Sequence, residues 1–256
     1  MGRYIDSHTH TYLRSSEDIE LMSLAGVEGV VVCSYFPIFP SGAATLIDLF
    51  RWISEGEPER LSSYGISVRA TVGIHPRSIP QSGLKQVFDH MLALFDNELA
   101  YGLGEVGIDS TSKMEEKVFR QQLRIVNEYR VPIIVHTPML NKLQMLDSIL
   151  KILDDENVDL GRVIMDHLTP DLVAKVRAKG AWAGITVQPG KLAPKDVCDI
   201  VIANGPEGIV VNSDLGKSPS DPLTLPKVAR AMDSASISGR DVELVTYSNI
   251  RKLFTM

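Results

Sequence analysis

Histidine and acidic side chains in this sequence gather at the ends of short apolar segments. Five of the six histidines follow or end such a segment, and two carboxylates are placed in the same way. These residues are His8, His10, His75, Glu105, His136, His167 and Asp214. A charged group directly after an apolar segment is costly to bury without a partner, and a metal ion is one such partner. Imidazole together with carboxylate suits Zn, Mn, Fe or Ni, whereas carboxylates alone would favour Mg or Ca.

His8 and His10 form the most compact part of this pattern. Side chains two residues apart in a strand point to the same side, so both imidazoles are able to converge on one ion. The sixth histidine, His90, lies inside a helical pattern, where we expect a solvated or half-packed side chain. For any single histidine the alternative is a hydrogen bond to the backbone, but the set as a whole favours a metal site.

The apolar segments themselves predict eight strands separated by helices. Near-continuous runs such as Val30-Val31-Val32 and Ile133-Ile134-Val135 are typical of buried parallel strands. The predicted strands are Arg3–Ser7, Gly29–Cys33, Ser67–Gly73, Ala100–Glu105, Pro132–His136, Arg162–Asp166, Ala181–Val187 and Gly208–Asn212. The predicted helices are Leu46–Ile53, Leu84–Phe95, Met114–Tyr129, Asn141–Leu153, Asp171–Lys179 and Pro194–Ala203.

Eight evenly spaced strand–helix units predict a closed (β/α)₈ barrel rather than an open doubly wound sheet. We expect residues 1–256 to form one such domain, because barrels of this type often use about 250 residues. Closure brings the carboxyl ends of all strands to one mouth, where barrel enzymes build their active sites. The sequence therefore predicts a metal site at this mouth, with Asp109 and Asp166 placed to orient ligating histidines.

Composition narrows the partners and the location. The formal net charge of −6 argues against an extended nucleic-acid surface, which needs a basic footprint, but permits a small phosphorylated substrate or a nucleic-acid end. We expect no membrane span and no signal peptide, and hence a cytoplasmic protein. Cys33 and Cys198 are expected to be buried free thiols. The oligomeric state is left open.

Several of these segments, in this order, resemble the TatD-like metal-dependent hydrolases of the amidohydrolase superfamily. The matching segments are Asp6-Ser7-His8-Thr9-His10, Gly73-Ile74-His75-Pro76, Gly104-Glu105-Val106-Gly107-Ile108-Asp109, Pro132-Ile133-Ile134-Val135-His136, His167, Asp214 and the closing Ser248-Asn249-Ile250-Arg251-Lys252-Leu253-Phe254. The resemblance implies a (β/α)₈ barrel with one or two divalent ions, of which Zn, Mn and Mg are the candidates. By this resemblance, His8, His10 and Asp214 would bind the first ion, His136 and His167 the second, and Glu105 would bridge the two. Because family members include DNases and exonucleases, phosphodiester hydrolysis is one implied activity.

Two loops depart from the TatD nuclease pattern. Those nucleases usually carry an Arg two residues after the fifth-strand His, where this chain has Pro138. Their eighth strand typically ends in Glu-Thr-Asp followed closely by Pro, where this chain has Asn212-Ser213-Asp214-Leu215. These loops shape the substrate pocket, so the departures bear on the substrate more than on metal binding.

We expect Glu105 and Asp214 to be catalytic as well as metal-binding. Glu105 would set the spacing of the ions, and Asp214 would accept the nucleophile's proton and pass it to the leaving group. His75 and Lys217 are predicted to contact the substrate, with a structural hydrogen bond and a solvated surface position as their respective alternatives. Asn141 and Lys142 have the same standing as Lys217.

The leading functional hypothesis is a hydrolase of phosphoesters, acting on a small molecule or an oligonucleotide end. The second is a hydrolase of amides or lactones, and the third is a metal-binding barrel without catalysis. The complete ligand set argues against the third, because degenerate barrels usually lose ligands.

Overall fold

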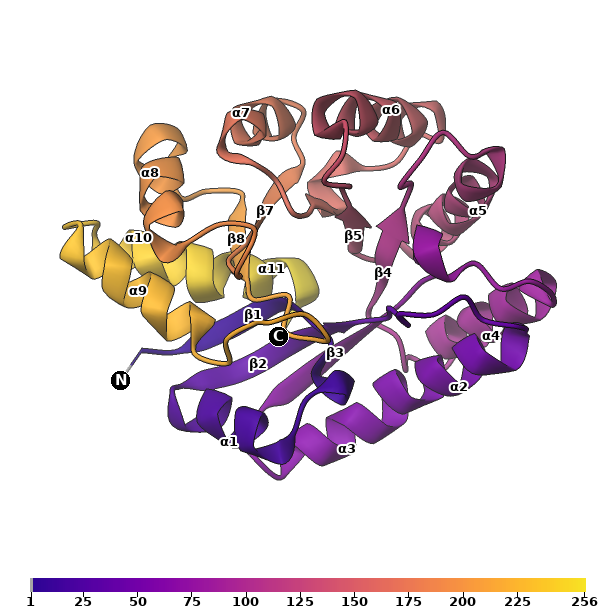
Figure 1. Cartoon of the computed structure of the whole chain (residues 1–256), viewed down its shortest axis with the longest axis horizontal. Helices are drawn as coiled ribbons and strands as arrows, with labels where there is room; N and C mark the ends of the chain where they lie inside the picture. The colour runs from indigo at the N-terminus through magenta and orange to yellow at the C-terminus, as the bar shows by residue number, and fades with distance from the viewer. Residues whose placement is uncertain (1) are drawn as a thin grey trace.

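Eight parallel strands pair in chain order in the computed structural model, which describes residues 2–256 (Figure 1). The strands are β1 (Tyr4–Thr9), β2 (Val27–Cys33), β3 (Ser67–Val72), β4 (Gly102–Gly107), β5 (Ile133–His136), β6 (Val163–Met165), β7 (Trp182–Thr186) and β8 (Ile209–Asn212). A bridge between Thr9 and Leu215 joins the end of β1 to the segment that follows β8. Hydrogen bonds from His10 N to Leu215 O (2.7 Å) and from Asp214 N to His8 O (3.1 Å) support this closure. The fold is the predicted (β/α)₈ barrel.

Helices surround the strands as an outer ring (Figure 1). They are α1 (Ser16–Leu24), α2 (Ala43–Arg51), α3 (Glu57–Ser62), α4 (Leu84–Asp96), α5 (Lys113–Tyr129), α6 (Lys142–Asp155), α7 (Pro170–Ala178), α8 (Pro194–Asn204), α9 (Thr224–Ser234), α10 (Gly239–Glu243) and α11 (Asn249–Phe254). One π-helical turn, Trp52–Gly56, joins α2 to α3, and another, Leu244–Ser248, joins α10 to α11. Among the described residues, no helix is long and apolar enough to cross a membrane.

All eight predicted strands and the predicted helices are confirmed, with shifted ends. The first strand extends to Thr9, so His8 lies within it. The strand β4 starts and ends two residues later than predicted, so Glu105 lies inside it rather than at its end. The helix predicted at Leu46–Ile53 begins at Ala43 and continues through a π-helical turn. The sequence patterns left α1, α3, α9 and α10 unpredicted. In α1 the helical signal is weak, because only Ile19 and Met22 of its nine residues are buried.

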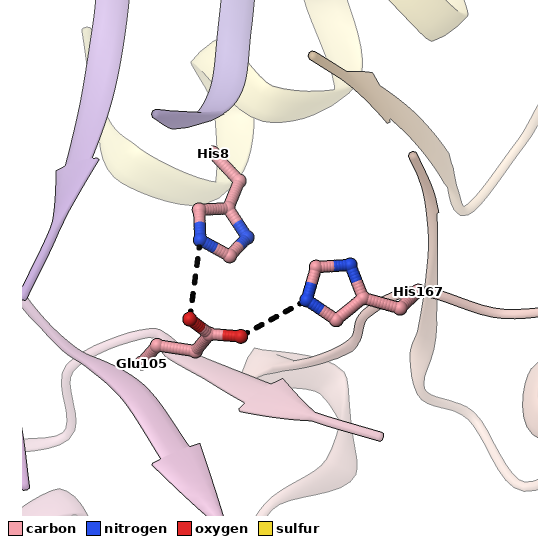
Figure 2. Close-up of side chains that lie close together, drawn as sticks. All are labelled: His8, Glu105 and His167. Carbon is pink, nitrogen blue, oxygen red and sulfur yellow. Dashed lines mark hydrogen bonds and ion pairs between the residues drawn. The ribbon is translucent and has the colours of Figure 1, made fainter. Parts of the chain in front are cut away.

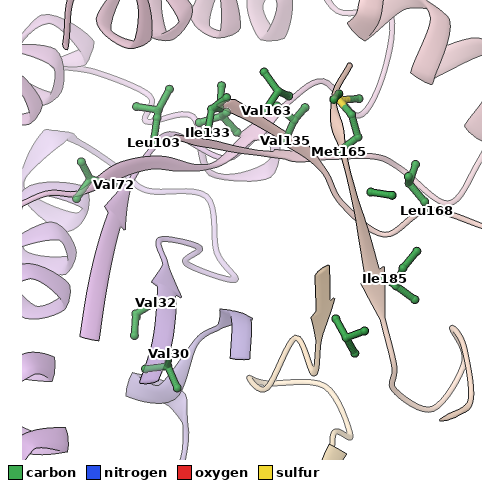
Figure 3. Packing of buried hydrophobic residues seen from close by; sticks show 14 of the residues in the cluster. Val30, Val32, Val72, Leu103, Ile133, Val135, Val163, Met165, Leu168 and Ile185 are labelled. Carbon is green, nitrogen blue, oxygen red and sulfur yellow. The ribbon is translucent and has the colours of Figure 1, made fainter. Parts of the chain in front are cut away.

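Alternation along the strands divides the core into two parts. Val30 and Val32 of β2 pack in the large cluster between strands and helices, whereas Val31 packs in a smaller cluster with Ile134 and Val210. Figure 3 shows Val30, Val32 and further members of the large cluster on successive strands. This two-residue period places the next inward position of β5 at His136, two residues beyond Ile134.

The large cluster supplies most of the apolar burial, and α5 contributes to it through Phe119, whose side chain is fully buried. We expect Phe119→Ala to lower the free energy of unfolding by about 3–5 kcal/mol, because truncation removes apolar burial and leaves a cavity. The matched control is Met114→Ala on the same helix, where a side chain that is 52% exposed should change stability by less than about 0.5 kcal/mol. Urea unfolding measures both, and equal effects would contradict this assignment of the core.

Candidate metal centre

The Glu105 carboxylate lies at the centre of the barrel mouth and is almost fully buried. A register shift in β4 turns both Leu103 and Val106 toward the outer core, which leaves Glu105, next to Val106, facing the interior. Its Oε1 lies 2.9 Å from His136 Nδ1 and 2.9 Å from His167 Nε2. Its Oε2 lies 3.6 Å from His8 Nε2 and 3.8 Å from His10 Nε2. Figure 2 shows His8 and His167 approaching the two different oxygens.

His8, His10 and Asp214 form the second part of the cluster. The two imidazoles approach each other with Nε2 atoms 3.2 Å apart, as the two-residue spacing predicts. Asp214 Oδ1 lies 3.3 Å from His10 Nε2 and 4.0 Å from His8 Nε2. Asp214 adopts a left-handed backbone conformation, with φ of 47°, in the turn directly after β8. The six predicted ligands therefore meet at one mouth. His8, His10 and Asp214 lie on the Oε2 side of the Glu105 carboxylate, and His136 and His167 lie on its Oε1 side.

The imidazole rings of His8, His10 and His167 are each held through Nδ1, which leaves Nε2 of each ring facing the centre of the cluster. His8 Nδ1 lies 2.5 Å from Asp166 Oδ2, and His10 Nδ1 lies 2.8 Å from the Cys33 carbonyl oxygen. His167 Nδ1 lies 2.8 Å from Thr186 Oγ1. When these Nδ1 atoms donate, each Nε2 carries a free lone pair directed into the cluster, which is the tautomer that a metal ligand needs.

His136 has the opposite arrangement, because its Nε2 lies 2.9 Å from Asp109 Oδ1 and its Nδ1 faces Glu105. The Arg77 guanidinium forms an ion pair with the other oxygen of Asp109. Burial alone raises the pKa of Asp109, but His136 and Arg77 outweigh it and hold that pKa below its usual range. Asp109 and Asp166 thus each contact an imidazole of the cluster.

We expect Asp109→Asn to weaken metal binding about 10- to 100-fold, because the group that fixes the His136 ring loses its charge. Equilibrium dialysis against a metal buffer measures this change. Asp89→Asn on the exposed face of α4 is the control and should bind metal as the wild type does. An Asp109→Asn variant with wild-type affinity would show that the carboxylate does not orient the ring.

His75, from the loop after β3, also reaches the cluster, with Nε2 3.9 Å from Glu105 Oε2. Its Nδ1 accepts a hydrogen bond from the backbone N–H of Arg77 (3.0 Å), so in the neutral ring the proton resides on Nε2. Burial lowers the pKa of His75 well below its usual range, which keeps the ring neutral. Unlike the other four histidines, His75 therefore presents a hydrogen-bond donor to the cavity.

The remaining sequence candidates lie farther out. Lys217 is exposed on the cavity rim, with Nζ 5.8 Å from the centre of the Tyr35 ring. Lys142 is directed away from the cavity, because its ammonium donates to Thr137 O and Oγ1 and to the His167 carbonyl (2.6–3.2 Å). Asn141 is exposed at the start of α6. Neither of the last two lines the cavity, so the structure places neither at the site.

A contact with Asp166 accounts for the Asn at position 212, where the TatD nucleases typically have Glu. The Asn212 side chain donates from Nδ2 to Asp166 Oδ1 (2.9 Å), next to the contact that orients His8. A Glu at position 212 would bring a second carboxylate against Asp166, so Asn is the residue that suits this partner. With Asn at position 212, the Asp214 carboxylate still faces the cluster.

Sequence reasoning missed Lys191 and Gln188, which follow β7. Lys191 Nζ lies 2.7 Å from Asp214 Oδ2, and Gln188 Nε2 lies 3.2 Å from the same oxygen. No histidine or acid follows β7, so the signal was limited to the position of these residues after a predicted strand. They line a cavity of about 160 Å³ together with all of the predicted ligands except His8. The other lining residues are His10, Tyr35, His75, Arg77, Glu105, His136, Thr137, Met139, His167, Asp214, Gly216, Lys217 and Ser218.

The electrostatics of the cluster favour a bound cation. Burial alone raises the pKa of Glu105, but the charge of His8 and the hydrogen bonds to His136 and His167 outweigh burial and hold that pKa well below its usual range. Burial lowers the pKa of His8 and His136, but neighbouring acidic groups outweigh it and raise both values. Burial and the Lys191 ammonium lower the pKa of His167, which favours its neutral, ligating form.

The donor set fits divalent metal ions. Three groups of side chains bring one ligand atom each to within 4.8 Å of one another. They are His8, Glu105 and His167; His8, His10 and Asp214; and His75, Glu105 and His136. The last group does not suit an ion, because His75 presents a proton rather than a lone pair. The other two share His8 and cover both sides of Glu105.

A (β/α)₈ barrel with this histidine and carboxylate cluster at its carboxyl-end mouth defines a metal-dependent hydrolase. The chain belongs to the TatD-related DNase family, whose model matches residues 5–255. It is 30% identical, over 98% of this chain and 100% of the relative, to an uncharacterized metal-dependent hydrolase of Methanocaldococcus jannaschii. These matches confirm the resemblance found in the sequence.

Solved structures agree with this assignment. A TatD-like protein of Archaeoglobus fulgidus superposes with a TM-score of 0.83 at 26% identity, covering 99% of this chain and 100% of that protein. The phosphotriesterase homology protein of Escherichia coli, solved with phosphate in its active site, superposes with a TM-score of 0.74 at 17% identity, covering 98% of each chain. The second likeness is one of fold.

Proposed function

We propose that this hydrolase cleaves phosphoesters, with a small phosphate ester or an oligonucleotide end as substrate. The observation that carries the proposal is the charge of the cavity wall. Lys191, Lys217 and Arg77 line the same cavity as the metal-ligand cluster. Cations around a metal site favour a substrate whose reacting group is an anion, and a phosphoryl group is such a group.

The size of the cavity supports a small substrate or a chain end. A volume of about 160 Å³ is close to that of an engineered cavity that holds benzene, of about 150 Å³. The net charge of −6 also argues against an extended nucleic-acid surface on this chain. The proposed substrate therefore inserts one phosphoryl group, and the rest of the molecule remains outside.

The proposed ligands are His8, His10 and Asp214 for one ion, His136 and His167 for a second, with Glu105 between them. A ligand set with four imidazoles favours Zn or Mn over Mg. When bound, such ions lower the pKa of a water molecule from about 16 to about 7 and polarise the phosphoryl group.

Side chains of this barrel perform the remaining tasks. One carboxylate oxygen of Asp214 faces His10 and the cavity. This oxygen accepts the proton of the nucleophile and passes it to the leaving group. The Nε2–H of His75 donates to an oxygen of the substrate, since its tautomer is fixed by the Arg77 backbone. Lys217 contacts a more distal anionic group at the rim.

The second candidate is hydrolysis of an amide or lactone. It is favoured by the neutral His75 ring, because an uncharged N–H donor also suits a carbonyl oxygen. Parallel assays of phosphodiesters, phosphomonoesters and lactones with Zn, Mn and Mg separate the two. The proposal expects turnover of phosphoesters to exceed that of lactones, and the reverse order would reject it.

A further inference from the structure

The loop after β7 brings a cation, Lys191, into the site. The TatD nucleases usually have an Arg after the β5 histidine, and this chain has Pro138 there. Lys142, the nearest cation along that loop, uses its ammonium on Thr137 and the His167 carbonyl. The β5 loop therefore presents no cation to the cavity, and Lys191 enters from β7 instead.

A tight turn fixes Lys191. The Lys191 backbone N–H donates to the Gln188 carbonyl (3.0 Å), and Val187 and Leu192 form a bridge that closes the turn. Gly190 has a φ of 85°, a conformation that L side chains rarely adopt. The turn also directs Gln188 Nε2 and Lys191 Nζ to the same oxygen, Asp214 Oδ2.

The hydrogen bonds around Lys191 leave part of its ammonium group unused. Its Nζ lies 3.1 Å from His167 Nδ1 as well as 2.7 Å from Asp214 Oδ2. Thr186 Oγ1 lies 3.3 Å from Asp166 Oδ1, so the Thr186 hydroxyl donates to this carboxylate and accepts from His167 Nδ1–H. A protonated Nδ1 does not accept a hydrogen bond from Lys191. Since an ammonium has three donors, one is used on Asp214 and two remain.

The other cations of the cavity are less suited to hold a reacting group. The Arg77 guanidinium forms an ion pair with Asp109, and its side chain is half exposed. Lys217 is exposed at the rim. The Lys191 side chain is 19% exposed and adjoins both Asp214 and His167, which are ligands on opposite sides of the cluster. Of the three cations that line the cavity, Lys191 is therefore the one whose described contacts include proposed metal ligands.

We propose that Lys191 binds an anionic oxygen of the substrate's phosphoryl group and so selects phosphoesters over neutral amides and lactones. The inference rests on the proposed function and adds to it the residue that recognises the charge. An ammonium recognises an anion as a point charge. An Arg at position 191 should therefore replace Lys191 better than a neutral side chain would. The Asp214 contact keeps Lys191 extended toward the cavity before the substrate arrives.

The test measures binding of inorganic phosphate by calorimetry to the metal-loaded protein, with metal content matched by elemental analysis. We expect Lys191→Met to weaken phosphate binding about 10- to 100-fold, which is the range for loss of a charged hydrogen bond. Lys191→Arg should recover the affinity to within about threefold of the wild type. Lys195→Met, on the exposed face of α8, is the control and should bind phosphate as the wild type does.

Each other outcome overturns the inference in a distinguishable way. Wild-type phosphate affinity in Lys191→Met, with phosphoester turnover in the wild type, would reject the role of Lys191 and leave the proposed function standing. Loss of metal from Lys191→Met would show that Lys191 acts by holding Asp214 in place, and it would overturn the role of Lys191 in anion binding. A wild-type protein that neither binds phosphate nor cleaves phosphoesters would reject both the proposed function and the inference.

Discussion

Replacement of Asp214 by Asn is expected to lower kcat by about 10²- to 10⁴-fold while most of the metal stays bound. Asn has the shape of Asp, and His8, His10 and Glu105 remain as proposed ligands, but the Asn amide does not accept a proton at neutral pH. Positioned proton transfer contributes about this factor to catalysis. The Oδ2 contacts to Lys191 and Gln188 hold the carboxylate in one orientation, so one oxygen is always directed to the cavity.

Turnover and metal content of Asp214→Asn should be measured on the same sample. Asp199→Asn, on the exposed face of α8, is the matched control and should keep both at wild-type levels. If Asp214→Asn retained both its metal and its wild-type rate, Asp214 would not be the proton acceptor. A variant that lost its metal would show that Asp214 acts chiefly as a ligand.

The second large effect is expected at Glu105. In Glu105→Gln one of the two oxygens becomes an NH₂ group, which donates hydrogen bonds and does not bind a cation. Because Oε1 faces His136 and His167 while Oε2 faces His8 and His10, either orientation of the amide disrupts one side of the cluster. We expect at least one ion per chain to be lost and turnover to fall more than about 100-fold.

Elemental analysis after dialysis measures the metal content of this variant. Glu128→Gln on the exposed face of α5 changes the same chemical group away from the site and should retain full occupancy. Full occupancy in Glu105→Gln would contradict the placement of Glu105 between the ions.

The barrel was predictable because its strands carry a simple signal. Apolar runs such as Val30-Val31-Val32 are buried on both faces, one against the helices and the other inside the barrel. Because all strands were predicted to run in one direction, His136 and Asp214, which lie at the ends of two of them, could be placed at the same mouth. Glu105 reaches the interior through an irregular register in β4, which sequence alternation alone does not reveal.

Other parts of the site depend on contacts between distant segments. The tautomer of His75 is set by the backbone N–H of Arg77, whereas the strand pattern indicated only that His75 follows a strand. Lys191 enters the site because a tight turn aims it at Asp214, and a Lys in a loop is ordinarily a solvated residue. The suitability of Asn212 becomes clear only once Asp166 lies beside it.

The most direct test of the account is the metal stoichiometry of the chelator-treated wild-type protein titrated with Zn or Mn. We expect one or two tightly bound ions per chain, and hydrolytic activity that rises in proportion to the bound metal. A protein that binds no ion, or whose activity is the same with and without metal, would contradict it.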